Sequence, residues 1–209
     1  MKLVNIKFNL FPYYIIMKTK KNNKNKNNKT RKASNIYIFG YGSLINKKEI
    51  SATLQRKTKI TPVILCESFG MKRCLNTKTK TGLKVFGIKY NKQKNTPING
   101  VLIKVNKHDL KKFDNREESY KKIDIPLEFI HFLKRKIPTN SHIYTYMPIN
   151  SRVISKNDKN LMFCKYYLDL CVFGCLEYGK NFAHMFFDTT YMMPNRFSNY
   201  KKWRYHFIN

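Results

Sequence analysis

The stretch that most constrains the fold is residues 36–45, which read IYIFGYGSLI. Four apolar residues with high β-propensity run into Gly-Tyr-Gly-Ser and then an apolar pair, so we predict a buried strand, a tight loop and a helix that begins near Asn46. Gly40 and Gly42 let the backbone adopt unusual angles and let a ligand approach the main chain closely. The loop therefore predicts a cradle of backbone amides for an anion or a carbonyl group, with a plain strand-to-helix turn as the structural alternative.

The residues of this loop exclude two nucleotide-binding signatures. The dinucleotide fingerprint G-x-G-x-x-G, counted from Gly40, requires a third glycine where the chain has Ile45. The phosphate-binding loop requires Gly-Lys followed by Ser or Thr, and no such sequence follows. The function of the loop therefore depends on a chemical partner elsewhere in the chain.

The length of 209 residues fits one domain with tails, and the formal net charge of +30 suggests an anionic partner such as nucleic acid or a membrane surface. The charge is uneven, since residues 1–32 hold ten of the basic residues and no acid. The other lysines are scattered among Asn and Ile, as a bias in codon usage would also produce. Because they form no stripe interleaved with aromatic residues, nucleic-acid binding is the less favoured interpretation.

The N-terminal segment has neither a signal peptide nor a membrane span in its pattern. Residues 1–17 are apolar in places but are broken by Lys7, Asn9 and Pro12, and Met17 is an alternative start. Residues 18–32 are of low complexity. We therefore predict a disordered basic leader over 1–34, a single domain over 35–209 and a cytoplasmic location.

Five cysteines form no C-x-x-C pair, and an odd count without a secretory signal predicts reduced, mostly buried thiols. Cys164, Cys171 and Cys175 recur at helical spacing and are candidate metal ligands. No histidine completes such a set nearby, so core packing is the favoured interpretation.

The rest of the chain predicts strands as far as residue 147 and helices after residue 155. The expected strands cover residues 60–70, 83–90, 101–105, 121–130 and 142–147, with a turn at 97–100. Residues 46–56 are expected to form a short polar helix or an extended loop. The expected helices cover 107–113 with Asn106 as N-cap, a segment from a cap at Ser155 or Asn157 to Gly179, and 181–190. This order predicts an α+β domain with a small, mixed, barrel-like or strongly twisted sheet flanked by helices.

A concentration of acidic residues marks a second candidate site. Three of the twelve acids of the chain lie within residues 113–120, which read FDNREESY. A solvated acid paired with Lys111 or Lys121 is the alternative interpretation of Glu117. The five histidines have no serine or cysteine partner at a recognisable spacing, so a hydrolytic triad is unsupported.

Together, the loop 39–45 and the segment Asp114-Asn115-Arg116-Glu117 with Tyr120 resemble the two signature motifs of the γ-glutamylcyclotransferases, including their ChaC-like and AIG2-like branches. The resemblance covers about residues 36–190. It implies a small mixed β-barrel with flanking helices. It also implies release of 5-oxoproline from a γ-glutamyl amino acid, peptide or amine, without a cofactor or a metal.

The resemblance also implies roles for single residues. Glu117 is the expected general base and acid, with Glu118 as its rival, whereas Arg116 is expected to form a structural ion pair. The expected substrate-binding residues are those of the loop and two tyrosines, with Tyr144 as a rival to the second: Tyr41, Gly42, Ser43, Leu44, Tyr120 and Tyr146. The loop amides are expected to hold the α-carboxylate of the substrate or the oxyanion that forms on its γ-carbonyl.

The sequence departs from the glutathione-specific ChaC branch after the early strands. That branch has a Gln, a Ser and an Asp-His-Arg-Gly segment, whereas residues 70–76 here read GMKRCLN. Glutathione is therefore not implied as the substrate, and the AIG2-like branch fits better. The alternative from another functional class is a non-catalytic barrel that binds nucleic acid or another polyanion through its positive charge.

Overall fold

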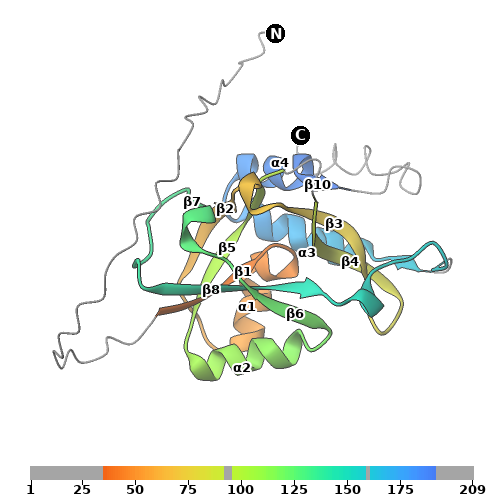
Figure 1. Cartoon of the computed structure of the whole chain (residues 1–209), viewed down its shortest axis with the longest axis horizontal. Helices are drawn as coiled ribbons and strands as arrows, with labels where there is room; N and C mark the ends of the chain where they lie inside the picture. The colour runs from red at the N-terminus through yellow and green to blue at the C-terminus, as the bar shows by residue number, and fades with distance from the viewer. Residues whose placement is uncertain (1–34, 92–95, 159–160, 192–209) are drawn as a thin grey trace, which may run out of the picture. The chain divides into compact units, whose positions relative to one another are not determined.

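A computed structural model describes residues 35–91, 96–158 and 161–191 (Figure 1). The predicted leader over 1–34 lies outside the described residues and stays a prediction. Ten strands form two mixed sheets in this part of the chain, with the orders β6-β8-β1-β5-β2-β7 and β10-β3-β4-β9. The bounds of the strands are β1 Asn35–Gly40, β2 Ile60–Leu65, β3 Met71–Lys78, β4 Leu83–Tyr90, β5 Ile98–Val105, β6 Tyr120–Asp124, β7 Ile130–Phe132, β8 Ser141–Pro148, β9 Met162–Phe163 and β10 Thr190–Tyr191.

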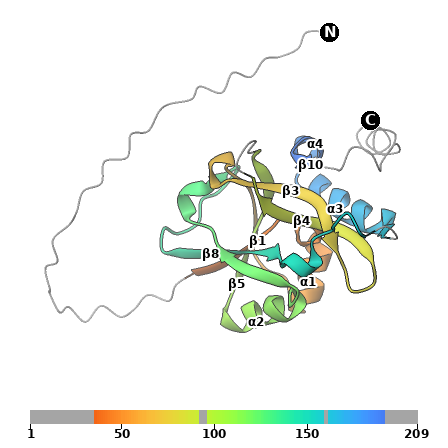
Figure 2. The same cartoon turned by 45° about the vertical axis from the view of Figure 1, so that its right-hand side comes forward.

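Four α-helices accompany the sheets in the described residues: α1 Lys47–Leu54, α2 Lys107–Arg116, α3 Lys165–Leu176 and α4 Lys180–Asp188. Figures 1 and 2 both show α1 and α2 close together, and α3 beside β4. None of the described helices is long and apolar enough to span a bilayer. The architecture is thus the predicted mixed α+β fold, with its strands arranged in two sheets.

Strand β1 is buried in the middle of the larger sheet. It pairs antiparallel with β5 and parallel with β8. Its alternate residues pack on opposite faces, so that Ile36 and Ile38 join one hydrophobic cluster while Tyr37 and Phe39 join the other. This double burial explains the continuous apolar run, and it holds the loop after Gly40 at the end of a central strand.

The loop after β1 leads into helix as predicted. A 3-10 turn at Ser43–Ile45 is followed by α1, whose N-cap Asn46 accepts a hydrogen bond from the Lys48 amide at 2.9 Å. A Cβ atom at Gly40 would lie 2.6 Å from the carbonyl oxygen of Leu44. The absence of a side chain at Gly40 therefore allows the chain to fold back on itself here.

Helix α2 begins at the predicted cap but continues further than predicted. The Asn106 side chain accepts from the Asp109 amide at 2.7 Å, and the Asp109 carboxylate accepts from the Asn106 amide, which forms a capping box. The helix ends at Arg116, and Glu117 is its C-cap. The acidic segment therefore starts within the last turn of α2, and not after the helix as predicted.

The prediction of one strand over 60–70 is wrong. Strand β2 ends at Leu65, and a 3-10 turn at Glu67–Phe69 leads to Gly70, whose φ of 76° reverses the chain. The chain then forms β3, which the sequence pattern did not predict and which pairs antiparallel with β4. The region that departs from the ChaC pattern is therefore largely a strand.

Two further strand boundaries need correction. Residues 98–100 do not form the predicted turn, because they pair with β2 as the first part of β5. The strand predicted over 121–130 is two strands, since β6 ends at Asp124 and Pro126 begins a 3-10 turn that leads to β7. The predicted strands over 83–90 and 142–147 are confirmed as β4 and β8.

The start predicted for the long C-terminal helix is wrong. Ser155 and Asn157 lie in a turn in which the Asp158 carboxylate accepts hydrogen bonds from the amide and hydroxyl of Ser155. Helix α3 starts at Lys165, with Cys164 as N-cap, and α4 confirms the second predicted helix. Cys171 and Cys175 are buried free thiols in the core, as predicted.

Candidate active site

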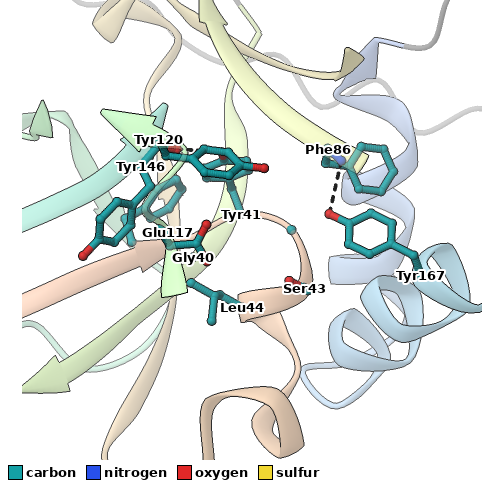
Figure 3. A pocket seen from close by; sticks show the side chains of 11 residues that line it. Gly40, Tyr41, Ser43, Leu44, Phe86, Glu117, Tyr120, Tyr146 and Tyr167 are labelled. Carbon is teal, nitrogen blue, oxygen red and sulfur yellow. Dashed lines mark hydrogen bonds between the residues drawn. The ribbon is translucent and has the colours of Figure 1, made fainter. Parts of the chain in front are cut away.

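A pocket lies at the end of β1, where the loop, α2, β4, β8 and α3 meet (Figure 3). Its volume is about 50 Å³, several times the ~10–15 Å³ that one water molecule occupies on this measure. It therefore has room for a small polar group. The lining residues are Phe39, Gly40, Tyr41, Gly42, Ser43, Leu44, Phe86, Glu117, Tyr120, Tyr146 and Tyr167.

The loop contributes the start of a 3-10 helix to this pocket. The carbonyl oxygens of Gly42 and Ser43 accept from the amides of Ile45 and Asn46, at 3.0 and 3.1 Å. The amides of residues 42–44 donate to no acceptor within the described parts of the chain. The first amides of a helix have no partner within it, so they are available to a ligand. That they hold a substrate stays a prediction.

Glu117 enters the pocket from the C-terminal end of α2. Its side chain is only 16% exposed, and its Oε1 atom accepts a hydrogen bond from Nε of Arg116 at 3.1 Å. Burial raises the pKa of this carboxyl above its ordinary value, and the Arg116 charge opposes that rise only in part. The group is thus a carboxyl whose proton affinity is increased by desolvation.

The rival acid, Glu118, does not line the pocket. Its side chain is 60% exposed and pairs with Lys80, which lowers the pKa of Glu118. The alternative in which Glu117 pairs with a surface lysine is also not what the structure shows, since the ion-pair partner of Glu117 is Arg116.

Arg116 joins the base to the loop. Its guanidinium bonds Glu117, the Ser43 hydroxyl at 3.2 Å and the Glu49 carboxylate at 3.3 Å. Nη1 also donates to the Thr53 hydroxyl at 2.5 Å. Arg116 is not among the residues that line the pocket. It forms ion pairs within the protein, which is the structural role that we predicted for it.

The three predicted tyrosines all line the pocket, but their hydroxyls differ. The Tyr41 hydroxyl donates to the backbone oxygen of Tyr146 at 2.7 Å, and the Tyr146 hydroxyl donates to Asp114 at 2.7 Å. Both hydroxyls are thus engaged by the protein itself. Burial, and then the Glu117 charge, raise the pKa of Tyr120, so its hydroxyl keeps its proton. The rival Tyr144 does not line the pocket; Lys122 lies over its ring.

Two further lining residues, Phe86 on β4 and Tyr167 on α3, were missed as site residues by the sequence prediction. Figure 3 shows them on the side of the pocket opposite Glu117 and Tyr120. The Phe86 amide donates to the Tyr167 hydroxyl at 3.1 Å. Periodicity predicted a half-buried strand around Phe86, but it carries no information on which helical residue faces it.

Within residues 35–91, 96–158 and 161–191, no three His, Cys, Asp or Glu side chains are grouped so as to hold a metal ion. The pocket itself offers one carboxylate among glycines, aromatic rings and a serine.

Solved structures with a similar fold include the two that follow. One is named gamma-glutamyl cyclotransferase and matches with a TM-score of 0.56 and 16% sequence identity. The other is an uncharacterised protein from Homo sapiens, with a TM-score of 0.55 and 16% identity; each match covers 79% of this chain and 92% of the other. No protein-family model and no curated protein matches the sequence. The chain therefore has the γ-glutamylcyclotransferase-like fold that its two motifs predicted.

Proposed function

We propose that the protein is a γ-glutamylcyclotransferase that releases 5-oxoproline from a γ-glutamyl amino acid, peptide or amine. One observation carries the proposal: Glu117, whose carboxyl is desolvated, and residues 42–44 of the loop line the same pocket. A base and an anion cradle within one pocket are what this cyclisation needs. The similar fold of the protein named gamma-glutamyl cyclotransferase supports the proposal.

The reaction is intramolecular and redox-neutral. Glu117 takes a proton from the substrate α-ammonium, and the free amine attacks the γ-carbonyl carbon to close a five-membered ring. Glu117 returns the proton to the leaving nitrogen as the bond from that carbon to this nitrogen breaks. The ring nitrogen then loses its second proton to the released amine, which departs as an ammonium ion. Because the nucleophile is tethered, the entropic cost of joining two molecules is avoided, and no cofactor takes part.

The loop and Tyr120 have separate roles in this mechanism. The amides of Gly42, Ser43 and Leu44 hold the α-carboxylate or the oxyanion, since both are negatively charged. The Tyr120 hydroxyl orients the glutamyl group. Tyr41 and Tyr146 contribute walls of the pocket, because their hydroxyls donate to protein acceptors. Five free thiols suit a reducing compartment, so we place the reaction in the cytoplasm.

The test is the appearance of 5-oxoproline from a panel of γ-glutamyl amino acids, peptides and amines, followed by mass spectrometry. We expect product with the natural protein and none above background with Glu117→Gln. The matched control is Glu118→Gln, which changes the neighbouring exposed acid and should leave turnover within about twofold. Circular dichroism of each variant checks the fold.

Two results would contradict the proposal. One is the absence of product from every compound, glutathione included. The other is a Glu117→Gln variant as active as Glu118→Gln. Binding to a polyanion that weakens steeply with salt and is indifferent to Glu117→Gln would instead favour the non-catalytic alternative.

A further inference from the structure

Tyr167 lies directly against the loop, on the wall of the pocket that faces Glu117. A Cβ atom built on Gly42 would lie 3.1 Å from the Tyr167 hydroxyl oxygen. Figure 3 shows this hydroxyl pointing from α3 toward Phe86 and the loop. The side chain comes from a helix more than 120 residues after the loop, so no local motif contains both.

The hydroxyl of Tyr167 is fixed by one hydrogen bond that it accepts. The Phe86 amide donates to its oxygen at 3.1 Å, and the ring packs on Phe86 with centroids 5.7 Å apart. Accepting a bond leaves the hydroxyl proton free to be donated. The hydroxyl also forms a side-chain hydrogen bond with the neighbouring Cys171 thiol, but burial raises the pKa of that thiol to about 12, and a neutral thiol is a weak acceptor that a charged substrate oxygen can replace.

The positions of the two pocket walls indicate which substrate atom can accept a hydrogen bond from the Tyr167 hydroxyl. Glu117 must reach the α-amine and then the leaving nitrogen, and in the tetrahedral intermediate the oxyanion occupies a different corner from these two nitrogens. The γ-carbonyl oxygen is therefore best placed toward the opposite wall, where the Tyr167 hydroxyl lies beside Gly42. Burial also raises the pKa of Tyr167, so the group remains a donor at neutral pH.

We propose that Tyr167 is a further catalytic residue, whose hydroxyl donates a hydrogen bond to the oxygen that becomes negatively charged when the α-amine attacks the γ-carbonyl. The inference rests on the proposed function. No covalent bond to Tyr167 forms or breaks, and the phenol keeps its proton throughout. Together with the loop amides, Tyr167 completes a set of donors around the developing charge.

The test is Tyr167→Phe, which removes one oxygen atom and keeps the ring. Removing an oxyanion donor typically costs about 100-fold or more in kcat, and we expect a fall of at least about tenfold with KM changed by less than about threefold. The matched controls are Tyr166→Phe, the exposed neighbour on the same helix, and Tyr178→Phe, a half-buried hydroxyl that bonds the Ile45 carbonyl outside the pocket. Both should keep kcat within about threefold.

A role in structure alone would give a different pattern. A fall in kcat of less than about tenfold relative to Tyr166→Phe, or a rise in KM with kcat unchanged, would overturn the inference while leaving the proposed function intact. If the natural protein forms no 5-oxoproline, the proposed function fails and this inference fails with it.

A second variant covers the case in which Tyr167→Phe does not fold. A 3-fluorotyrosine inserted at position 167 alone keeps the ring. It also keeps a hydroxyl that can accept from the Phe86 amide and donate to the substrate oxygen. Because this hydroxyl is more acidic, it is a stronger donor. We expect a higher kcat than with the same residue at position 166. An equal or lower kcat contradicts the role of donor.

Discussion

Nε of Arg116 lies 3.1 Å from Oε1 of Glu117, while Nη2 of the same guanidinium lies 3.3 Å from Oε2 of Glu49. One positive charge is therefore shared between the acid in the pocket and an acid on α1. Because Arg116 also bonds Glu49, it stabilises the Glu117 carboxylate only in part, and burial keeps the pKa of Glu117 raised.

Glu49→Gln is expected to lower the pKa of Glu117. The change removes a nearby negative charge and frees the Arg116 charge to stabilise the Glu117 carboxylate. Because the ionised form is the base, the acidic limb of the kcat/KM profile should move to lower pH. The control is Glu177→Gln, which breaks a comparable ion pair with Lys47 and should leave the limb in place. A limb that stays fixed, or moves up, in Glu49→Gln would show that Glu49 does not act on the base.

Glu117→Gln is expected to change how stability depends on pH. The folded protein holds the Glu117 proton more tightly than the unfolded chain, whose carboxyl titrates near its ordinary value of 4.5. The natural protein therefore loses stability as pH rises from about 4.5 through the raised pKa, and the glutamine variant does not. In thermal melts from pH 4 to pH 8, the Tm of the variant relative to the natural protein should rise with pH and then level off. A constant or falling difference would mean that the carboxyl is not desolvated.

Gly40→Ala is expected to destabilise the loop. The new Cβ would lie 2.6 Å from the Leu44 carbonyl oxygen and 2.8 Å from the Leu44 Cβ, so the backbone must shift. We expect a loss of about 1–3 kcal/mol in the free energy of unfolding, measured by denaturant titration, and a loss of turnover. Unchanged stability would show that the chain does not fold back so tightly at this point.

Arg73→Lys is expected to cost stability and activity together. Arg73 is fully buried and donates to the carbonyl oxygens of Tyr41, Asn99 and Phe186, at 3.1, 2.9 and 2.9 Å. A lysine has three donors and no planar fork, so some of these acceptors lose their partner. We expect a loss of about 3 kcal/mol or more in unfolding free energy. The control, Arg56→Lys, changes a side chain that is 44% exposed and should cost under about 1 kcal/mol.

Local patterns predicted the parts of the site that are contiguous in sequence. The apolar run into Gly40, the cap at Asn106 and the acidic segment at Glu117 each carry their own signal within a few residues. The structure places the loop and the acid together in one pocket, as their pairing suggested. The roles given to these residues stay predictions until they are tested.

Other parts of the fold depend on contacts between distant residues. Strand β3 reads MKRCLNTK, and its three basic residues do not fit the apolar pattern that predicts a buried strand. One of them, Arg73, is buried and bonds residues up to 117 positions away. Tyr167 reaches the pocket only because α3 packs against the loop, and Tyr166 beside it is exposed. Helical periodicity predicts a buried face, but it does not say which hydroxyl on that face reaches a distant loop.

The central claim is that the substrate's own α-amine is the nucleophile, and a blocked substrate tests it most directly. A γ-glutamyl compound and its Nα-acetyl derivative are each incubated with the natural protein, and the released amine, 5-oxoproline and glutamate are quantified. The account predicts equal amounts of amine and 5-oxoproline from the free compound and no amine from the acetylated one. Release of amine from the acetylated compound, or of glutamate in place of 5-oxoproline, would contradict it.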